Sequence, residues 1–177
     1  MKWISVDEEY LNYLRAIEHR IPKTDYGSDR YKPFFGVLFE VDDLYYVTQV
    51  SHPQPRHQKM KQQKDFFKLF HPKRIDNLIA VVNLNYMFPI PKQYTNDFEY
   101  KNIDLYRTFS SETEKSRYIN LLNLELRAIN SLNLGTKAKD LYDWKYANPN
   151  DTVSKRCIDF KNIENLAKLY KVEQDTP

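Results

Sequence analysis

Residue types suited to acid–base chemistry stand together where one extended segment of the chain ends. Ser51 and His52 follow a β-branched, aromatic run, and His57 comes five residues after His52. An imidazole with a pKa near 6.5 can take up or release a proton at neutral pH. Lys32 precedes the neighbouring extended run and adds a cation. Together these side chains could transfer protons and stabilise negative charge on a phosphate.

Cleavage of RNA without a metal ion requires such a set. A base must take the proton of the 2′-hydroxyl, cations or hydroxyl donors must stabilise the phosphorane, and an acid must protonate the departing 5′ oxygen. Simpler roles also fit these positions. His52 and His57 could be ordinary surface histidines, Ser51 a strand terminator, and Lys32 a solvated residue.

A strongly basic segment runs from His52 to Arg74. It holds seven lysines and arginines against a single acid, Asp65, although the formal charge of the whole chain is only +3. Three phenylalanines between residues 66 and 70 lie among these cations. Cations beside rings that can stack on bases suit RNA or single-stranded DNA. A solvated, charged connector whose phenylalanines turn inward is the alternative.

Composition narrows the class of protein. With 177 residues, of which 41% are hydrophobic and 15% aromatic, a single domain over 1–177 with its own core is predicted. No apolar run approaches the roughly 18 residues of a membrane span, and the N-terminus lacks an apolar signal region, so we expect a cytoplasmic protein. The only cysteine, Cys157, cannot form an internal disulfide. Without a Gly-rich phosphate loop or metal-ligand motif, neither a cofactor nor a metal is expected.

The apolar pattern predicts an α+β fold, in which an antiparallel sheet core at about 1–92 is followed by a helical part at about 105–172. The residues Ser5 to Glu8 resemble a capping box. Segment 59–70 fits either a basic helix or an extended arm. The predicted elements are a helix near 6–19, strands 34–41, 44–50, 78–83 and 85–90, and helices near 112–132, 137–146 and beyond an N-cap at Asp159.

Seven short motifs follow one another along the first 92 residues. In order and spacing they resemble the ToxN/AbiQ toxins, and beyond residue 92 only the helical character is shared. The motifs are Tyr10-Leu-Asn-Tyr-Leu14, Ile21-Pro22, Lys32-Pro-Phe-Phe-Gly36, Ser51-His52-Pro53, Arg56-His57, Phe67-Lys-Leu69 and Asn83–Ile90.

This resemblance implies a metal-independent endoribonuclease, the toxin of a type III toxin–antitoxin system that acts in phage abortive infection. Its products would be a 2′,3′-cyclic phosphate and a 5′-hydroxyl, from cellular or phage RNA. It would process, and be inhibited by, a small repeat-derived RNA antitoxin folded as a pseudoknot, in a closed protein–RNA assembly. The implied fold is a strongly twisted antiparallel sheet flanked by helices, similar to MazF/Kid toxins.

The resemblance also implies site residues. The active-site tyrosine of the family corresponds to Tyr10 and its lysine to Lys32, while its second tyrosine corresponds to Tyr26 or Tyr31. Where the family has Thr-Ser-Pro-Lys, this chain has Ser51-His52-Pro53-Gln54, so Arg56 or Lys59 could supply the missing cation.

From both lines of reasoning we predict the following roles. Ser51 contacts the scissile phosphate, Lys32 stabilises the developing charge, and His52 or His57 shuttles protons. Tyr10 orients the phosphate or donates a proton, and Phe67 stacks on a base or packs in the core. The residues predicted to bind the RNA backbone are Arg56, Lys59, Lys61 and Lys64. A non-catalytic RNA-binding protein that uses the 52–74 segment is the principal alternative.

Overall fold

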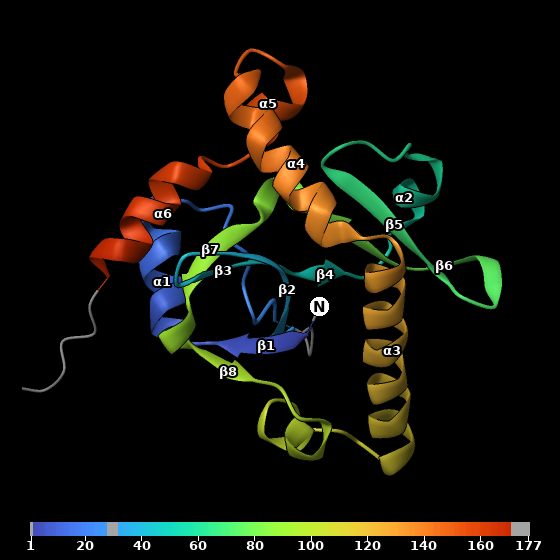
Figure 1. Cartoon of the computed structure of the whole chain (residues 1–177). Coiled ribbons are helices and arrows are strands. Elements are labelled where there is room, and N and C mark those ends of the chain that lie inside the picture. Colours follow the sequence, from blue (N-terminus) through green and yellow to red (C-terminus); the bar gives the residue numbers. More distant parts are fainter. Residues whose placement is uncertain (1, 28–31, 171–177) are drawn as a thin grey trace, which may run out of the picture.

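The computed structural model describes residues 2–27 and 32–170. Its strands form two antiparallel sheets with helices around them (Figure 1). The larger sheet has the order β7-β3-β2-β1-β8, and the smaller has the order β4-β6-β5. The larger sheet comprises β1 (Trp3–Val6), β2 (Phe34–Val41), β3 (Leu44–Thr48), β7 (Phe88–Pro91) and β8 (Thr95–Asp97); the smaller comprises β4 (Val50–Ser51), β5 (Phe66–His71) and β6 (Arg74–Asn83).

The predicted hairpin is confirmed as β2 and β3, which pair antiparallel from Val41↔Leu44 to Gly36↔Thr48. Asp42 in the turn has a φ of 53°, which aspartate tolerates better than most residues. The second strand ends at Thr48, before the predicted end at residue 50. The chain then passes to the smaller sheet, where Val50 pairs with Val82 of β6. This change of sheet sets the position of the histidine that follows.

The first helix begins later than predicted. Ser5 belongs to β1, opposite Phe34 of β2, and is not a helix cap. Asp7 caps α1 (Glu8–Ile17) instead, its carboxylate accepting the Tyr10 N–H at 3.0 Å. The strand escaped prediction because its stability comes from pairing with β2 and β8, far away in sequence.

Two segments of the middle region differ from the sequence-based expectation. Segment 59–70 is neither one helix nor one arm. Helix α2 (Pro55–Lys59) ends at Lys59, the first residue of that segment, and β5 starts at Phe66. The predicted strand 85–90 is divided, because a 3₁₀ turn (Leu84–Tyr86) comes before β7. β7 then pairs with β3 in the other sheet, so this short turn carries the chain from one sheet to the other.

The predicted C-terminal helices are confirmed. Ser111 caps α3 (Glu112–Ser131) by accepting the Glu114 N–H, and Asp159 caps α6 (Phe160–Leu169). Between them lie α4 (Leu134–Ala147) and α5 (Thr152–Arg156), the latter unpredicted. Figure 1 shows α3 on one side of the sheets and α1 with α6 on the other. Two 3₁₀ turns, Lys92–Tyr94 and Tyr100–Leu105, flank β8.

The sheets and helices enclose a main core rich in aromatic side chains, which includes Tyr10, Phe35, Tyr46, Phe88 and Phe160. An α+β fold with antiparallel sheets flanked by helices is therefore confirmed. The similarity to MazF/Kid toxins and the single-domain boundaries stay predictions. Within 2–27 and 32–170, no helix combines the length and apolarity that a bilayer crossing requires.

Candidate active site

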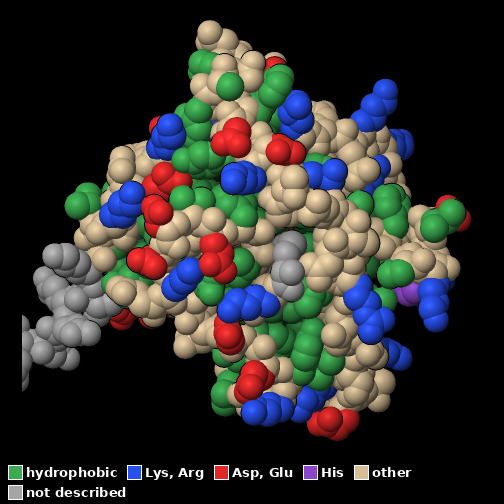
Figure 2. Space-filling model, in the orientation of Figure 1, with side chains coloured by type: hydrophobic (Ala, Val, Ile, Leu, Met, Phe, Trp, Pro, Cys, Tyr) green, Lys and Arg blue, Asp and Glu red, His purple; other side chains and the backbone are tan. Residues whose placement is uncertain are grey.

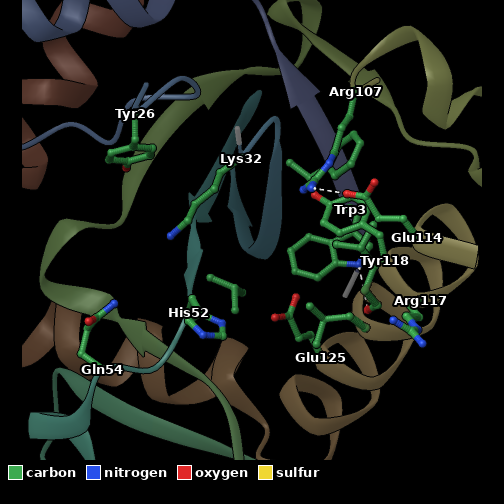
Figure 3. A pocket seen from close by; sticks show the side chains of 14 residues that line it. Trp3, Tyr26, Lys32, His52, Gln54, Arg107, Glu114, Arg117, Tyr118 and Glu125 are labelled. Carbon is green, nitrogen blue, oxygen red and sulfur yellow. Dashed lines mark hydrogen bonds and ion pairs between the residues drawn. The ribbon is translucent and has the colours of Figure 1, made fainter. Parts of the chain in front are cut away.

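A cavity of about 560 Å³ opens between the sheets and α3 (Figure 3). Four parts of the chain contribute to its wall. They are Trp3 of β1, the segment that leads into β2 with Tyr26 and Lys32, the residues around His52 after β4, and one face of α3 with the Arg107 loop before it. The cavity thus joins residues that lie far apart in the sequence, from Trp3 to Glu125.

Lys32 is held by its backbone at the edge of this cavity. Its N–H donates to the Thr24 carbonyl at 2.6 Å, and its carbonyl accepts from the Gln49 amide at 3.0 Å. Gln49, which is buried, also accepts the Tyr26 hydroxyl at 2.8 Å. Figure 3 shows the Lys32 side chain pointing into the cavity, and its ammonium lies 5.4 Å from the Tyr26 ring centre. Gln49 therefore fixes both Lys32 and Tyr26 relative to the end of β3.

His52 lies across the opening from α3, and Gln54 also lines the wall. Val50 lines the cavity as well, whereas Ser51 does not. Successive side chains of an extended chain point to opposite faces. Val50 and His52 therefore point to the cavity side, and Ser51 points to the opposite side. The structure brings His52 to Lys32 and Tyr26, and the contact of Ser51 with a phosphate stays a prediction.

The far wall of the cavity is one face of α3. Glu114, Tyr118, Leu121 and Glu125 recur at spacings of three, four and seven, which places them on one side of a helix. The Trp3 indole N–H donates to the Leu122 carbonyl at 3.2 Å and ties this helix to β1. None of these residues is a sequence-predicted site residue.

Two arginines add positive charge to the wall. Arg107 pairs with Glu114 at 3.1 Å, and its guanidinium lies 4.6 Å from the Tyr118 ring centre. The Ser110 N–H and hydroxyl also donate to Glu114, and together with Arg107 they lower the pKa of that carboxyl. Arg117 is exposed on the next turn of α3. Cations placed in this way can attract and orient a phosphate.

Glu125 is the most unusual group of the cavity. The residue is only 8% exposed, and burial raises the pKa of its carboxyl to about 8, an effect that the nearby charge of Lys32 opposes. Burial also raises the pKa of Tyr118 to about 12. At neutral pH the Glu125 carboxyl therefore carries a proton in most molecules.

Tyr10 lies in the core and not at the cavity. It is fully buried, and its hydroxyl donates to the Pro89 carbonyl at 3.0 Å. Its ring stacks on Tyr94 with centres 5.5 Å apart, and burial raises the pKa of its phenol. The helical apolar spacing at this position reflects packing.

His57 is also turned inward. Its Nδ1 accepts the Gln54 N–H at 2.9 Å, which caps α2, and its Nε2 accepts from the Arg56 guanidinium at 3.3 Å. Burial, followed by the charges of Arg56 and Lys68, lowers the pKa of the imidazole. His57 does not line the cavity, so His52 is the histidine available there.

The predicted RNA-binding cations Arg56, Lys59, Lys61 and Lys64 are all exposed. Figure 2 shows lysine and arginine side chains gathered over the part of the surface that holds α2 and β5. Phe67 is partly buried at a second cavity of about 340 Å³, where the Lys137 ammonium lies 5.7 Å from its ring centre. Tyr31 lies outside the described residues. Within the described ranges, no three His, Cys, Asp or Glu side chains are grouped so as to hold a metal ion.

A comparison with known protein families matches nearly the whole chain. The sequence model of the family described as "Toxin ToxN, type III toxin-antitoxin system" matches residues 2–168. Among curated proteins, the endoribonuclease ToxN of Pectobacterium atrosepticum is 26% identical over 92 residues, which cover 51% of this chain and 54% of that protein. The matched region thus spans about half the length of that relative.

Solved structures show the same fold. One, from work on a processed non-coding RNA that regulates a bacterial antiviral system, has a TM-score of 0.76 at 19% identity and covers 96% of this chain and 99% of its own. A second, the lactococcal anti-phage endoribonuclease AbiQ of a type III toxin–antitoxin system, has a TM-score of 0.75 at 20% identity and covers 96% of each chain. At these identities the likeness establishes the fold.

Proposed function

Because this chain belongs to the ToxN family of toxins of type III toxin–antitoxin systems, we propose that it is a metal-independent endoribonuclease. The observation that carries the proposal is the cavity that gathers Lys32, His52, Arg107 and Arg117 from distant parts of the chain. Cations and an imidazole around one opening suit attack of a 2′-hydroxyl on the adjacent phosphorus. The proposed products are a 2′,3′-cyclic phosphate and a 5′-hydroxyl.

The proposed roles follow from placement. Lys32 stabilises the charge of the phosphorane, because its side chain points into the cavity while its backbone is held by Thr24 and Gln49. His52 takes part in proton transfer, since it faces the same space. Ser51 is retained as a candidate phosphate contact, next to His52 in the chain. The exposed cations of the 52–74 segment bind the RNA backbone on either side.

The proposed partners are RNAs. Relatives of this chain are described as inhibited by a non-coding RNA pseudoknot or regulated by a processed non-coding RNA. We extend this to a repeat-derived RNA antitoxin, bound in a closed protein–RNA assembly, with cellular or phage RNA as the substrate. With such substrates, the proposed site of action is the cytoplasm.

The test is incubation of the purified protein with total bacterial RNA in excess EDTA. We expect discrete fragments that carry a 2′,3′-cyclic phosphate. Intact RNA that still co-migrates with the protein would leave the alternative of a non-catalytic RNA-binding protein. Intact RNA with no association would remove both.

Replacing Tyr10 with phenylalanine is expected to lower stability without slowing cleavage. The change removes the hydroxyl that donates to the Pro89 carbonyl. Loss of one buried hydrogen bond lowers the free energy of unfolding by on the order of 1 kcal/mol. Urea unfolding and the cleavage rate of the same preparation would be compared with those of the unaltered protein. A large loss of rate at unchanged stability would return Tyr10 to the active site.

A further inference from the structure

Glu125 is the buried acid of the cavity. Figure 3 shows its carboxyl pointing into the opening beside Trp3 and facing the side of His52. Leu121 and Leu122 lie next to it in the wall. The residue is only 8% exposed, and the oxygens of its carboxyl face the cavity. Burial of a carboxylate destabilises a fold, so stability does not account for an acid at this position.

The charged and titratable groups around Glu125 come from several elements. They are Lys32 before β2, His52 after β4, Arg107 in the loop before α3, and Glu114, Arg117 and Tyr118 on α3 itself. The Glu114 carboxylate forms an ion pair with Arg107 and accepts a hydrogen bond from the Ser110 N–H. Burial raises the pKa of Glu125 to about 8, and the charge of Lys32 only partly opposes this effect. A carboxyl in this condition holds a proton that it can donate near neutral pH.

We propose that Glu125 is the general acid of RNA cleavage, with His52 as the general base. The inference rests on the proposed endoribonuclease function and deepens it. His52 removes the proton from the 2′-hydroxyl, and the 2′ oxygen forms a bond to phosphorus. The bond from phosphorus to the 5′ oxygen then breaks, and the Glu125 proton passes to that oxygen. Return of the proton from His52 to Glu125 through solvent restores both groups.

The test uses the E125Q variant on two RNA oligonucleotides that contain a cleavage site mapped with the unaltered protein. One has the ordinary 5′ oxygen at that site, and the other has a bridging sulfur, which departs as a stable thiolate and needs no proton. Glutamine keeps the shape of the side chain but cannot supply the proton. We expect cleavage of the ordinary RNA to fall by about 100-fold or more, and cleavage of the sulfur-containing RNA to stay near the unaltered rate.

A second readout is the pH dependence of the rate. In the unaltered protein the rate on ordinary RNA should fall as the pH rises through about 8, where Glu125 loses its proton. E125Q should lack this decline. The matched control is E112Q, which removes an exposed carboxylate from the first turn of the same helix and should leave the rate unchanged. E125D, with a displaced carboxyl, should show the same substrate pattern and serves if E125Q does not fold.

Each other outcome overturns the inference. An equal loss on both RNAs would mean that Glu125 does not protonate the leaving group, and no loss on either would mean that it takes no part. Failure of the unaltered protein to cleave ordinary RNA would remove the proposed function itself, and with it this role. Melting temperatures of all variants, measured alongside, separate loss of chemistry from loss of fold.

Discussion

Replacing Lys32 with alanine is expected to slow RNA cleavage by about 100- to 1,000-fold, the loss typical when one group that stabilises developing charge is removed. The Lys32 side chain points into the cavity, and its ammonium lies 5.4 Å from the Tyr26 ring centre. In the proposed reaction this cation stabilises the extra negative charge of the phosphorane. The fold should tolerate the change. The hydrogen bonds of this residue to Thr24 and Gln49 are made by its backbone and survive in alanine.

The measurement is the single-turnover cleavage rate in EDTA, together with thermal unfolding of the same samples. Lys155→Ala is the matched control, since Lys155 is exposed on α5 and does not line the cavity. Lys32→Arg keeps the charge and should recover part of the rate. A fall in melting temperature of many degrees with Lys32→Ala would make this lysine structural, and an unchanged rate would exclude it from catalysis.

Local signals predicted much of the fold. The β2–β3 hairpin was recognisable because its strands are adjacent in sequence and join at Asp42-Asp43. Helices α3 and α6 were recognisable because their caps, Ser111 and Asp159, are short-range features. In contrast, β1 depends on pairing with β2 and β8, and its four residues carry no pattern that outweighs the neighbouring helix signal.

The residues of the candidate site likewise separate into those with local sequence signals and those that depend on tertiary packing. Lys32 and His52 were selected because they flank one predicted hairpin, and Tyr26 because the family resemblance implies a tyrosine at Tyr26 or Tyr31; the structure brings Lys32, His52 and Tyr26 to one cavity. Tyr10 and His57 have suitable chemistry, but burial decides their placement, and side-chain type does not reveal burial. Periodicity alone could not separate a packed tyrosine from an exposed one.

The cavity residues after position 105 were missed because only tertiary packing brings α3 to Lys32. One signal was nevertheless present. Leu122 and Ile129 lie on the buried stripe of α3, and Glu125, three residues after Leu122, falls on that stripe. An acid within an apolar stripe indicates either a buried partner or a function.

Replacing Glu125 with glutamine is expected to stabilise the protein at high pH and to have little effect at low pH. The folded state raises the pKa of this carboxyl from its ordinary 4.5 to about 8, so the folded protein holds the proton more tightly than the unfolded chain. The contribution of the protonated Glu125 carboxyl to the free energy of unfolding is therefore fully present below pH 4.5 and is lost as the pH rises through about 8. The shift corresponds to about 3 kcal/mol at pH 7 and about 5 kcal/mol above pH 8.

Urea unfolding of the unaltered protein and of Glu125→Gln at pH 5, 7 and 9 measures this difference, because other titrating groups are common to both. Their free energies of unfolding should diverge steadily with pH, whereas Glu112→Gln should follow the unaltered protein. Parallel curves would mean that the carboxyl is hydrated or paired at every pH. Divergence would show that the burial which holds a transferable proton at neutral pH is the same burial that lowers the stability of the fold.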